Sequence, residues 1–159
     1  MMENQKEMRQ TEQQRIYQEH YQAWFKNLSE NHKLIVESNG NDVYSVSLMK
    51  IAYWRHSIDK DRREAALKEQ ADLILKKLTF LSEHFKLLEM DRVHQRALLR
   101  SESPYQTENR ISYFEILLKQ GHFFQMTRVK NENHRIREIP FVLPWEIADR
   151  LIQFVKSLL

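Results

Sequence analysis

The scarcity of chain-breaking residues constrains this sequence more than any other feature. Two glycines and three prolines occur among 159 residues, about a quarter of the roughly 12% that these residues contribute to ordinary globular proteins. Because glycine and proline mark most tight turns, a chain with so few of them has few turns available. We therefore expect long secondary-structure elements, and the glycine-rich loops that bind nucleotide phosphates are excluded.

The remaining composition is that of a folded chain without thiol chemistry. Hydrophobic residues make up 42% and aromatic residues 11% of the sequence, which excludes a wholly disordered chain. The absence of cysteine excludes disulfide frameworks, zinc fingers and thiol catalysis. No stretch approaches the roughly 20 apolar residues of a membrane-spanning helix, and the polar start does not resemble a signal peptide. We therefore expect a cytoplasmic protein.

The first half of the chain shows the hydrophobic spacing of helices. A stripe of apolar residues recurs at steps of four, three and four, as in an amphipathic helix. The stripe consists of Tyr17, Tyr21, Trp24 and Leu28. Residues 1–15 are almost all polar and form an expected extension ahead of it. A further helix is predicted over roughly residues 60–81, because Asp61 and Glu64 resemble a capping box.

The glycine at position 40 follows an asparagine, and this pair supports two interpretations. In one, the pair is the type I′ turn of a β-hairpin between residues 34–36 and 43–46. In the other, Gly40 ends the first helix and Asp42 caps a second one. We prefer the second interpretation, because residues 43–54 are apolar nearly all round and long enough for a buried helix.

Around Ser82 the spacing of apolar residues changes from helical to alternating. Short segments rich in apolar and branched residues then follow one another, separated by turn residues. The expected strands are residues 85–91, 96–101, 111–119, 123–130 and 134–143. Short connections join neighbouring antiparallel strands. A helix is expected over residues 145–158, preceded by Pro144 as a helix-starting residue.

These patterns together predict an α+β protein. A helical N-terminal half, with two or three helices over residues 16–82, is followed over residues 83–159 by an antiparallel β-meander of four or five strands and a C-terminal helix. We expect the two regions to form one cooperative unit. The helix packs on one face of the sheet, so the other face is left open to water or to a partner.

Catalytic and metal-binding patterns are absent from the sequence. The seven histidines show neither an H-E-x-x-H motif nor a paired spacing, and no cysteine completes a zinc site. A serine nucleophile needs a G-x-S-x-G elbow, and Glu115 with Lys119 lacks the second carboxylate of a metal-dependent nuclease. We therefore expect a non-enzymatic protein without a cofactor or a metal.

Large aromatic side chains are more numerous in the first half than a small helical layer needs to seal itself. Aromatic residues are enriched where proteins meet. The candidate protein interface consists of Tyr17, Tyr21, Trp24, Phe25, Tyr53 and Trp54. The first functional hypothesis is therefore an adaptor or accessory protein that binds a protein partner, or a second copy of itself, through its helical half.

The alternative hypothesis places a ligand on the open face of the sheet. Strand alternation favours a cationic and aromatic surface there. The candidates are Arg100, Tyr113, Lys119, Arg128, Arg135 and Arg137. Because bases stack on aromatic rings and guanidinium groups pair with phosphates, such a surface suits single-stranded nucleic acid. Three glutamates dilute this patch, and the net charge of the chain is only +3.

Overall fold

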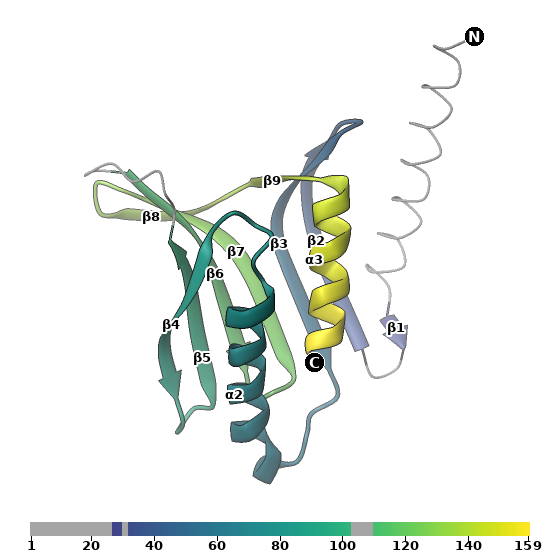
Figure 1. Ribbon diagram of the computed structural model, residues 1–159, viewed down its shortest axis with the longest axis vertical. Coiled ribbons are helices and arrows are strands. Elements are labelled where there is room, and N and C mark those ends of the chain that lie inside the picture. The colour runs from purple at the N-terminus through teal and green to yellow at the C-terminus, as the bar shows by residue number, and fades with distance from the viewer. Residues whose placement is uncertain (1–26, 30–31, 103–109) are drawn as a thin grey trace.

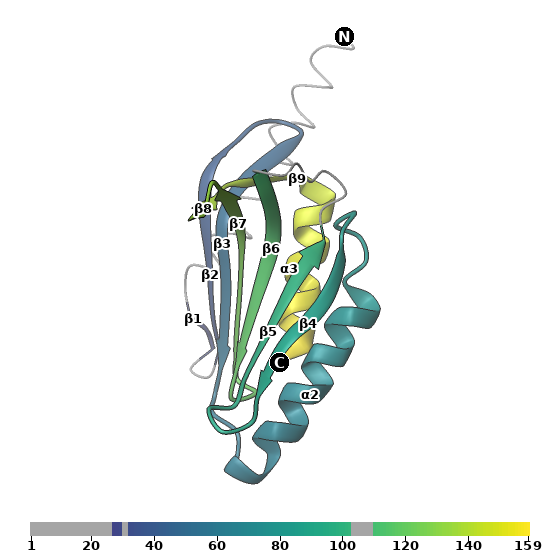
Figure 2. The ribbon, with the colours of Figure 1, turned by 90° about the vertical axis from the view of Figure 1, so that its left-hand side faces the viewer.

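The computed structural model describes residues 27–29, 32–102 and 110–159 of the protein. In chain order its elements are β1 (Asn27–Ser29), β2 (His32–Asn41), β3 (Ser45–Arg55), α2 (Lys60–Lys77), β4 (His84–Asp91), β5 (Arg96–Glu102), β6 (Arg110–Lys119), β7 (Phe123–Glu132), β8 (Arg135–Ile139), β9 (Phe141–Pro144) and α3 (Trp145–Leu158). The nine described strands form one antiparallel sheet, and both helices lie against the same face of it (Figure 1 and Figure 2).

The sheet runs in the order β1-β2-β3-β7-β6-β5-β4 and opens at one end between β3 and β7. The first half of β7 pairs with β3, whereas its second half pairs with β8. Beyond Pro140 the chain returns as β9, which pairs with the first half of β3. The connection from β8 to β9 therefore spans the opening between the two central strands (Figure 1).

The expected α+β class with a helical N-terminal half is wrong, because the described part of that half is mainly β-sheet. Residues 43–54, expected as a buried helix, contribute most of β3. The register against β2 skips Met49, so the buried residues of β3 do not alternate strictly along the strand. Those that join the core cluster are Val46, Leu48, Ile51 and Tyr53. The alternation in β3 is interrupted, and its other face carries the apolar residues Ala52 and Trp54. The sequence pattern of such a strand resembles that of a helix that is apolar on all sides.

The hairpin interpretation of this segment is the correct one, although its turn is not the Asn-Gly pair. Asp42 Oδ1 accepts hydrogen bonds from the amides of Tyr44 and Ser45, at 2.7 Å each. The Asp42 amide in turn donates to the carbonyl of Ser45 at 2.9 Å. Asp42 therefore caps a turn between β2 and β3 instead of a helix, and the two backbone amides lower the pKa of its carboxyl.

The remaining expectations differ from the structure mainly at element boundaries. The segment expected as one strand over residues 134–143 forms β8 and β9, separated by Pro140, which cannot donate a ladder hydrogen bond. The helix expected over residues 60–81 ends at Lys77, whereas α3 has the expected bounds. The polar extension over residues 1–15 and the stripe from Tyr17 to Trp24 lie outside the described residues.

The hydrophobic core fills the space between the sheet and the two helices. It takes buried side chains from β2 to α3, so one cluster connects most elements. Among its fully buried members are Leu34, Ile51, Ile74, Leu99, Ile116 and Ile152. Phe80, which follows α2, packs edge to face on Phe154 of α3, with ring centroids 6.5 Å apart. The buried side chains of both helices therefore share one core with the sheet, and Phe80 connects the end of α2 to α3.

A polar cluster is enclosed on the helix-covered side of the sheet. Arg128 donates to Glu83 at 2.7 Å and to Ser112 at 3.0 Å. Glu83 also accepts a hydrogen bond from the Ser101 hydroxyl at 3.0 Å, and this hydroxyl oxygen accepts a hydrogen bond from the backbone amide of Phe114 at 2.7 Å. Only 15% of the Arg128 side chain and 10% of the Glu83 side chain are exposed. The cluster thus ties the turn before β4 to β5, β6 and β7.

Glu83→Gln is predicted to lower the free energy of unfolding by roughly 3 kcal/mol, because it leaves the enclosed Arg128 charge without its partner. Urea unfolding followed by circular dichroism measures the loss. Arg128→Met serves as the second arm of a double-mutant cycle, and the double variant is expected to lose less than the two single losses combined. Additive losses would show that the two side chains do not stabilise each other.

Candidate binding site on the open face of the sheet

No described helix covers the face of the sheet opposite α2 and α3 (Figure 2). Because paired residues of antiparallel strands point to the same face, the strand register arranges the side chains of this open face in rows. One row crosses β2, β3, β7, β6 and β5 near the ends of the strands. It consists of Lys33, Trp54, Phe123, Lys119 and Arg96. We call this set the cation–aromatic row.

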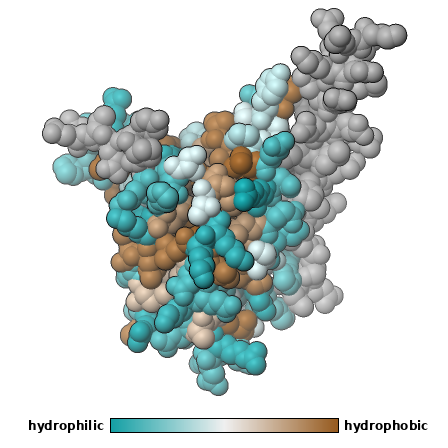
Figure 3. All heavy atoms as spheres, viewed as in Figure 1, coloured by the Kyte–Doolittle hydropathy of each residue, from teal (hydrophilic) through white to brown (hydrophobic). Residues whose placement is uncertain are grey.

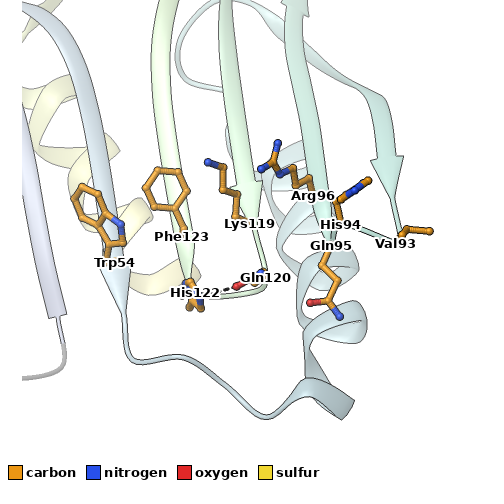
Figure 4. A pocket seen from close by; sticks show the side chains of 9 residues that line it. All are labelled: Trp54, Val93, His94, Gln95, Arg96, Lys119, Gln120, His122 and Phe123. Atoms are coloured by element: carbon orange, nitrogen blue, oxygen red, sulfur yellow. Dashed lines mark hydrogen bonds between the residues drawn. The ribbon is translucent and has the colours of Figure 1, made fainter.

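The central members of the row contact one another directly. The rings of Trp54 and Phe123 meet edge to face, with centroids 5.2 Å apart. The Nζ atom of Lys119 lies 5.2 Å from the centroid of the Phe123 ring. Figure 4 shows Trp54, Phe123, Lys119 and Arg96 side by side on successive strands. At the usual spacing of strands, these four positions span roughly 14 Å.

A hollow of about 490 Å³ lies over this row and reaches the neighbouring turns. Besides four members of the row, its lining contains side chains from the β4–β5 and β6–β7 turns. These are Val93, His94, Gln95, Gln120 and His122. The hollow therefore combines aromatic surface and positive charge with amide and imidazole groups that can form hydrogen bonds with a ligand (Figure 4).

Hydrogen bonds to three other elements fix the β6–β7 turn below the hollow. Gln70 of α2 donates through Nε2 to the carbonyl of Gly121 at 2.9 Å. The backbone amide of Arg55, at the end of β3, donates to the carbonyl of His122 at 3.0 Å. The backbone amide of Gln120 donates to the backbone carbonyl of Gln95 at 2.8 Å. The turn is thereby attached to a helix on the opposite side of the sheet.

Glycine is required at position 121 by both backbone and packing. Its φ of +75° lies in the left-handed region, which residues with a side chain rarely adopt. A Cβ atom there would lie 2.7 Å from Ile58 Cδ1 and 3.0 Å from the Cβ atom of Ala66. The close approach of this turn to the segment around α2 therefore depends on the missing side chain.

Gly121→Ala is expected to lower the free energy of unfolding by about 1–3 kcal/mol, the usual cost of overpacking. Chemical denaturation measures the loss. Ile58→Val removes the Cδ1 atom that the new methyl group meets, so the same substitution should cost less in the Ile58→Val background. An equal cost in both backgrounds would show that backbone strain alone, and not the contact with Ile58, excludes a side chain.

The surroundings of His122 at this turn favour the neutral form of its imidazole. Burial of the imidazole lowers its pKa below the ordinary value of 6.5, and the charges of Arg63 and Arg55 lower the pKa further. Nε2 lies 3.2 Å from Oε1 of Gln120, whereas Nδ1 is buried and has no partner among the described residues. Protonation of this histidine therefore opposes the folded arrangement of the turn.

The free energy of unfolding is expected to fall as the pH drops below about 6.5, because the unfolded chain then binds a proton at His122 more readily than the folded chain. Above that pH His122 is neutral in both the folded and the unfolded chain, so it no longer makes the free energy of unfolding depend on pH. Urea unfolding at pH 7.5 and pH 5 measures the difference. It should be smaller in His122→Gln, and smaller in Arg63→Gln, which removes a charge that lowers the pKa. Equal differences in the wild-type protein and His122→Gln would contradict this role.

The structure distributes the six candidate nucleic-acid residues over both faces of the sheet. Arg100, Tyr113 and Lys119 lie on the open face, where Arg100 stacks 4.3 Å from the centroid of the Tyr113 ring and pairs with Glu115 at 3.2 Å. The helix-side face carries Arg128, Arg135 and Arg137, as the pairing of β7 with β8 shows. The six residues therefore do not form one surface.

Two of the arginines on the helix side lie near carboxylates. Arg128 belongs to the enclosed polar cluster with Glu83. Arg137 lies near Glu132, whose pKa is lowered by a hydrogen bond from Lys130 and by the charges of Lys130, Arg110 and Arg137. Positive charge at this end of β7 and β8 is thus partly balanced within the chain.

The six candidate protein-interface residues are not placed together by the described residues. Tyr17, Tyr21, Trp24 and Phe25 lie outside them. Tyr53 is 2% exposed, and its hydroxyl lies 2.6 Å from His32 Nδ1. Trp54, the next residue along β3, points to the open face and belongs to the cation–aromatic row.

Sequence reasoning missed Phe123, Arg96 and Lys33 as site residues, and it assigned Trp54 and Lys119 to different hypotheses. The hairpin interpretation of residues 34–46 carried a usable signal, because extending it through β3 places Tyr53 and Trp54 on opposite faces. The neighbours of Trp54 in the row depend on the pairing of β3 with β7, which the sequence does not reveal.

Three further findings bear on the kind of protein this is. Among the described residues, no cluster of three or more histidine, aspartate or glutamate side chains could hold a metal ion. No described helix has the length and apolar character needed to cross a membrane. Comparison of the chain with models of protein families, with curated proteins and with solved structures gives no match.

Proposed function

We propose that the protein is a non-enzymatic binding protein that holds single-stranded nucleic acid on the open face of its sheet. The observation that carries this proposal is the contact between Trp54 and Phe123, continued across the sheet by Lys119 and Arg96. Aromatic rings provide stacking surfaces for bases of any sequence, and neighbouring cations bind the phosphates between them.

The arrangement favours a strand that crosses the β-strands along the row. Bases would stack on Trp54, which is partly exposed and held in place by the buried ring of Phe123, while the ammonium of Lys119 and the guanidinium of Arg96 bind the backbone beyond it. The side-chain amides of Gln95 and Gln120 line the same hollow and can form hydrogen bonds with base edges. Single strands fit this surface better than duplexes, because their bases are free to stack on side chains.

The described residues lack the helical N-terminal layer on which the adaptor hypothesis was based. It depended on aromatic side chains presented by a helical N-terminal half, and the described residues of that half form β-strands and α2. Tyr53 is buried in the core. Of the residues on which the hypothesis was based, Trp54 alone is placed on the open face by the described part of the chain, and there it belongs to the cation–aromatic row.

Binding to a fluorescently labelled single-stranded oligonucleotide at low salt is the expected result, with the affinity falling as salt rises. Trp54→Leu should weaken binding by roughly 5-fold to 150-fold, because it removes the stacking of one base, which contributes about 1–3 kcal/mol. Arg96→Gln should also weaken binding. It should reduce the slope of log affinity against log salt concentration by about 0.7, because one phosphate contact is lost. Fluorescence anisotropy measures both.

Arg137→Gln is the matched control, since it removes an exposed arginine from β8 on the helix-side face. It should leave the affinity and its salt dependence close to those of the wild-type protein. Two results would overturn the proposal. One is the absence of binding by the wild-type protein at low salt, and the other is an equal effect of Arg96→Gln and Arg137→Gln, which indicates charge attraction without a site.

A further inference from the structure

The strand β4 forms one border of the sheet and is open along its outer side. It is the last strand of the sheet order, and no described element pairs with its other edge. Figure 2 shows this edge facing the viewer. The strand is eight residues long without a proline. Natural edges are protected by short strands, proline, charged side chains, bulges or a covering element, because an open edge pairs readily with another strand. β4 carries Lys86 and a register shift at Leu88, but it is long, lacks proline and is not covered at its edge by any described strand.

Apolar side chains are exposed at the middle of this edge. Leu87 is 39% exposed and Leu88 is 50% exposed. Figure 3 shows hydrophobic atoms along the side of the molecule on which β4 lies. Large apolar side chains on an open strand edge favour association over a solvated state.

A register shift in β4 determines which side chains share a face. Leu88 is an extra residue between the pairs that Leu87 and Glu89 form with β5. Lys86 is paired with Arg100 and Glu89 with Leu98, and both partners belong to the open face. The extra residue therefore places Lys86 and Glu89 on the same face, although strict alternation would place them on opposite faces.

This pattern makes β4 complementary to itself. When two copies pair antiparallel about a two-fold axis between Leu87 and Leu88, Lys86 lies opposite Glu89 of the partner subunit, twice in each pair of strands. On the helix side, Phe85 lies opposite Met90 of the partner subunit. The Lys86–Glu89 and Phe85–Met90 pairs each join side chains of the same face, and the charged pairs are of opposite sign, which stabilises neighbouring strands.

We infer that the protein forms a homodimer in which β4 pairs with β4 of a second copy and the two sheets become one. A two-fold axis perpendicular to the sheet keeps both open faces on the same side of the dimer. An isologous contact of this kind closes after two copies, so it protects the edge without forming fibres. The inference rests on the edge, the exposed leucines and the charge pattern, and is independent of any ligand.

A charge-swap series tests this arrangement in the absence of nucleic acid. Wild-type protein is expected to change from the 19.4 kDa chain mass to twice that mass as its concentration rises in sedimentation velocity. Lys86→Glu and Glu89→Lys each place like charges opposite one another twice, so each should raise the dimer Kd by about tenfold or more. The double variant Lys86→Glu/Glu89→Lys restores opposite charges and should regain the wild-type Kd.

The matched control uses the ion pair that Lys86 forms with Glu102 within one chain. Lys86→Glu/Glu102→Lys restores this internal pair but leaves like charges opposite one another between subunits, so it should remain as weakly dimeric as Lys86→Glu. Circular dichroism checks that all variants are folded. Wild-type protein that stays at the chain mass at every concentration overturns the inference. A dimer that persists unchanged in both single variants, or that the double swap does not restore, overturns it equally.

Discussion

The one-sided burial of the sheet is the constraint on which the rest of the structure depends. Both helices lie on the same face, and one core cluster takes side chains from β2, β3, α2, the later strands and α3. Because apolar side chains alternate with others along each strand, burying one face forces the second set of side chains onto a surface that no described helix covers. The cation–aromatic row is built entirely from that second set, and side chains of two neighbouring turns complete the hollow over it.

Strict alternation decided how much of the fold could be predicted from the sequence. The strands after residue 82 and the helix α3 were recognisable, because their periods are close to two and to 3.6. In β3 the extra residue Met49 interrupts the alternation, so a strand resembled a buried helix. In β4 the extra residue Leu88 did not hide the strand, but the side chains that share a face could not be assigned without its pairing with β5. Register shifts of this kind are set by the pairing of strands and leave no local signal in the sequence.

In the candidate site, too, residue types could be recognised from the sequence, whereas the neighbours of each residue depend on strand pairing. Trp54 and Lys119 were identified by residue type, but nothing near them in the chain indicated that they share a surface. Their proximity results from the pairing of β3 with β7 and of β7 with β6, which joins segments on either side of α2. Arg128 illustrates the converse, since its strand was recognised correctly but its side chain, expected on the open face, lies on the helix-covered face.

The support of the candidate site lies in the core and not on the surface. The carbonyl of Gly121 is held by Gln70 from the helix side of the sheet, and a Cβ atom at this residue would lie 2.7 Å from Ile58 Cδ1. Phe123, which follows in the same turn, is only 8% exposed, so its ring is fixed against Trp54 before any ligand arrives. Binding to a preformed strip of this kind would cost the protein less conformational entropy than binding to side chains that must first become ordered.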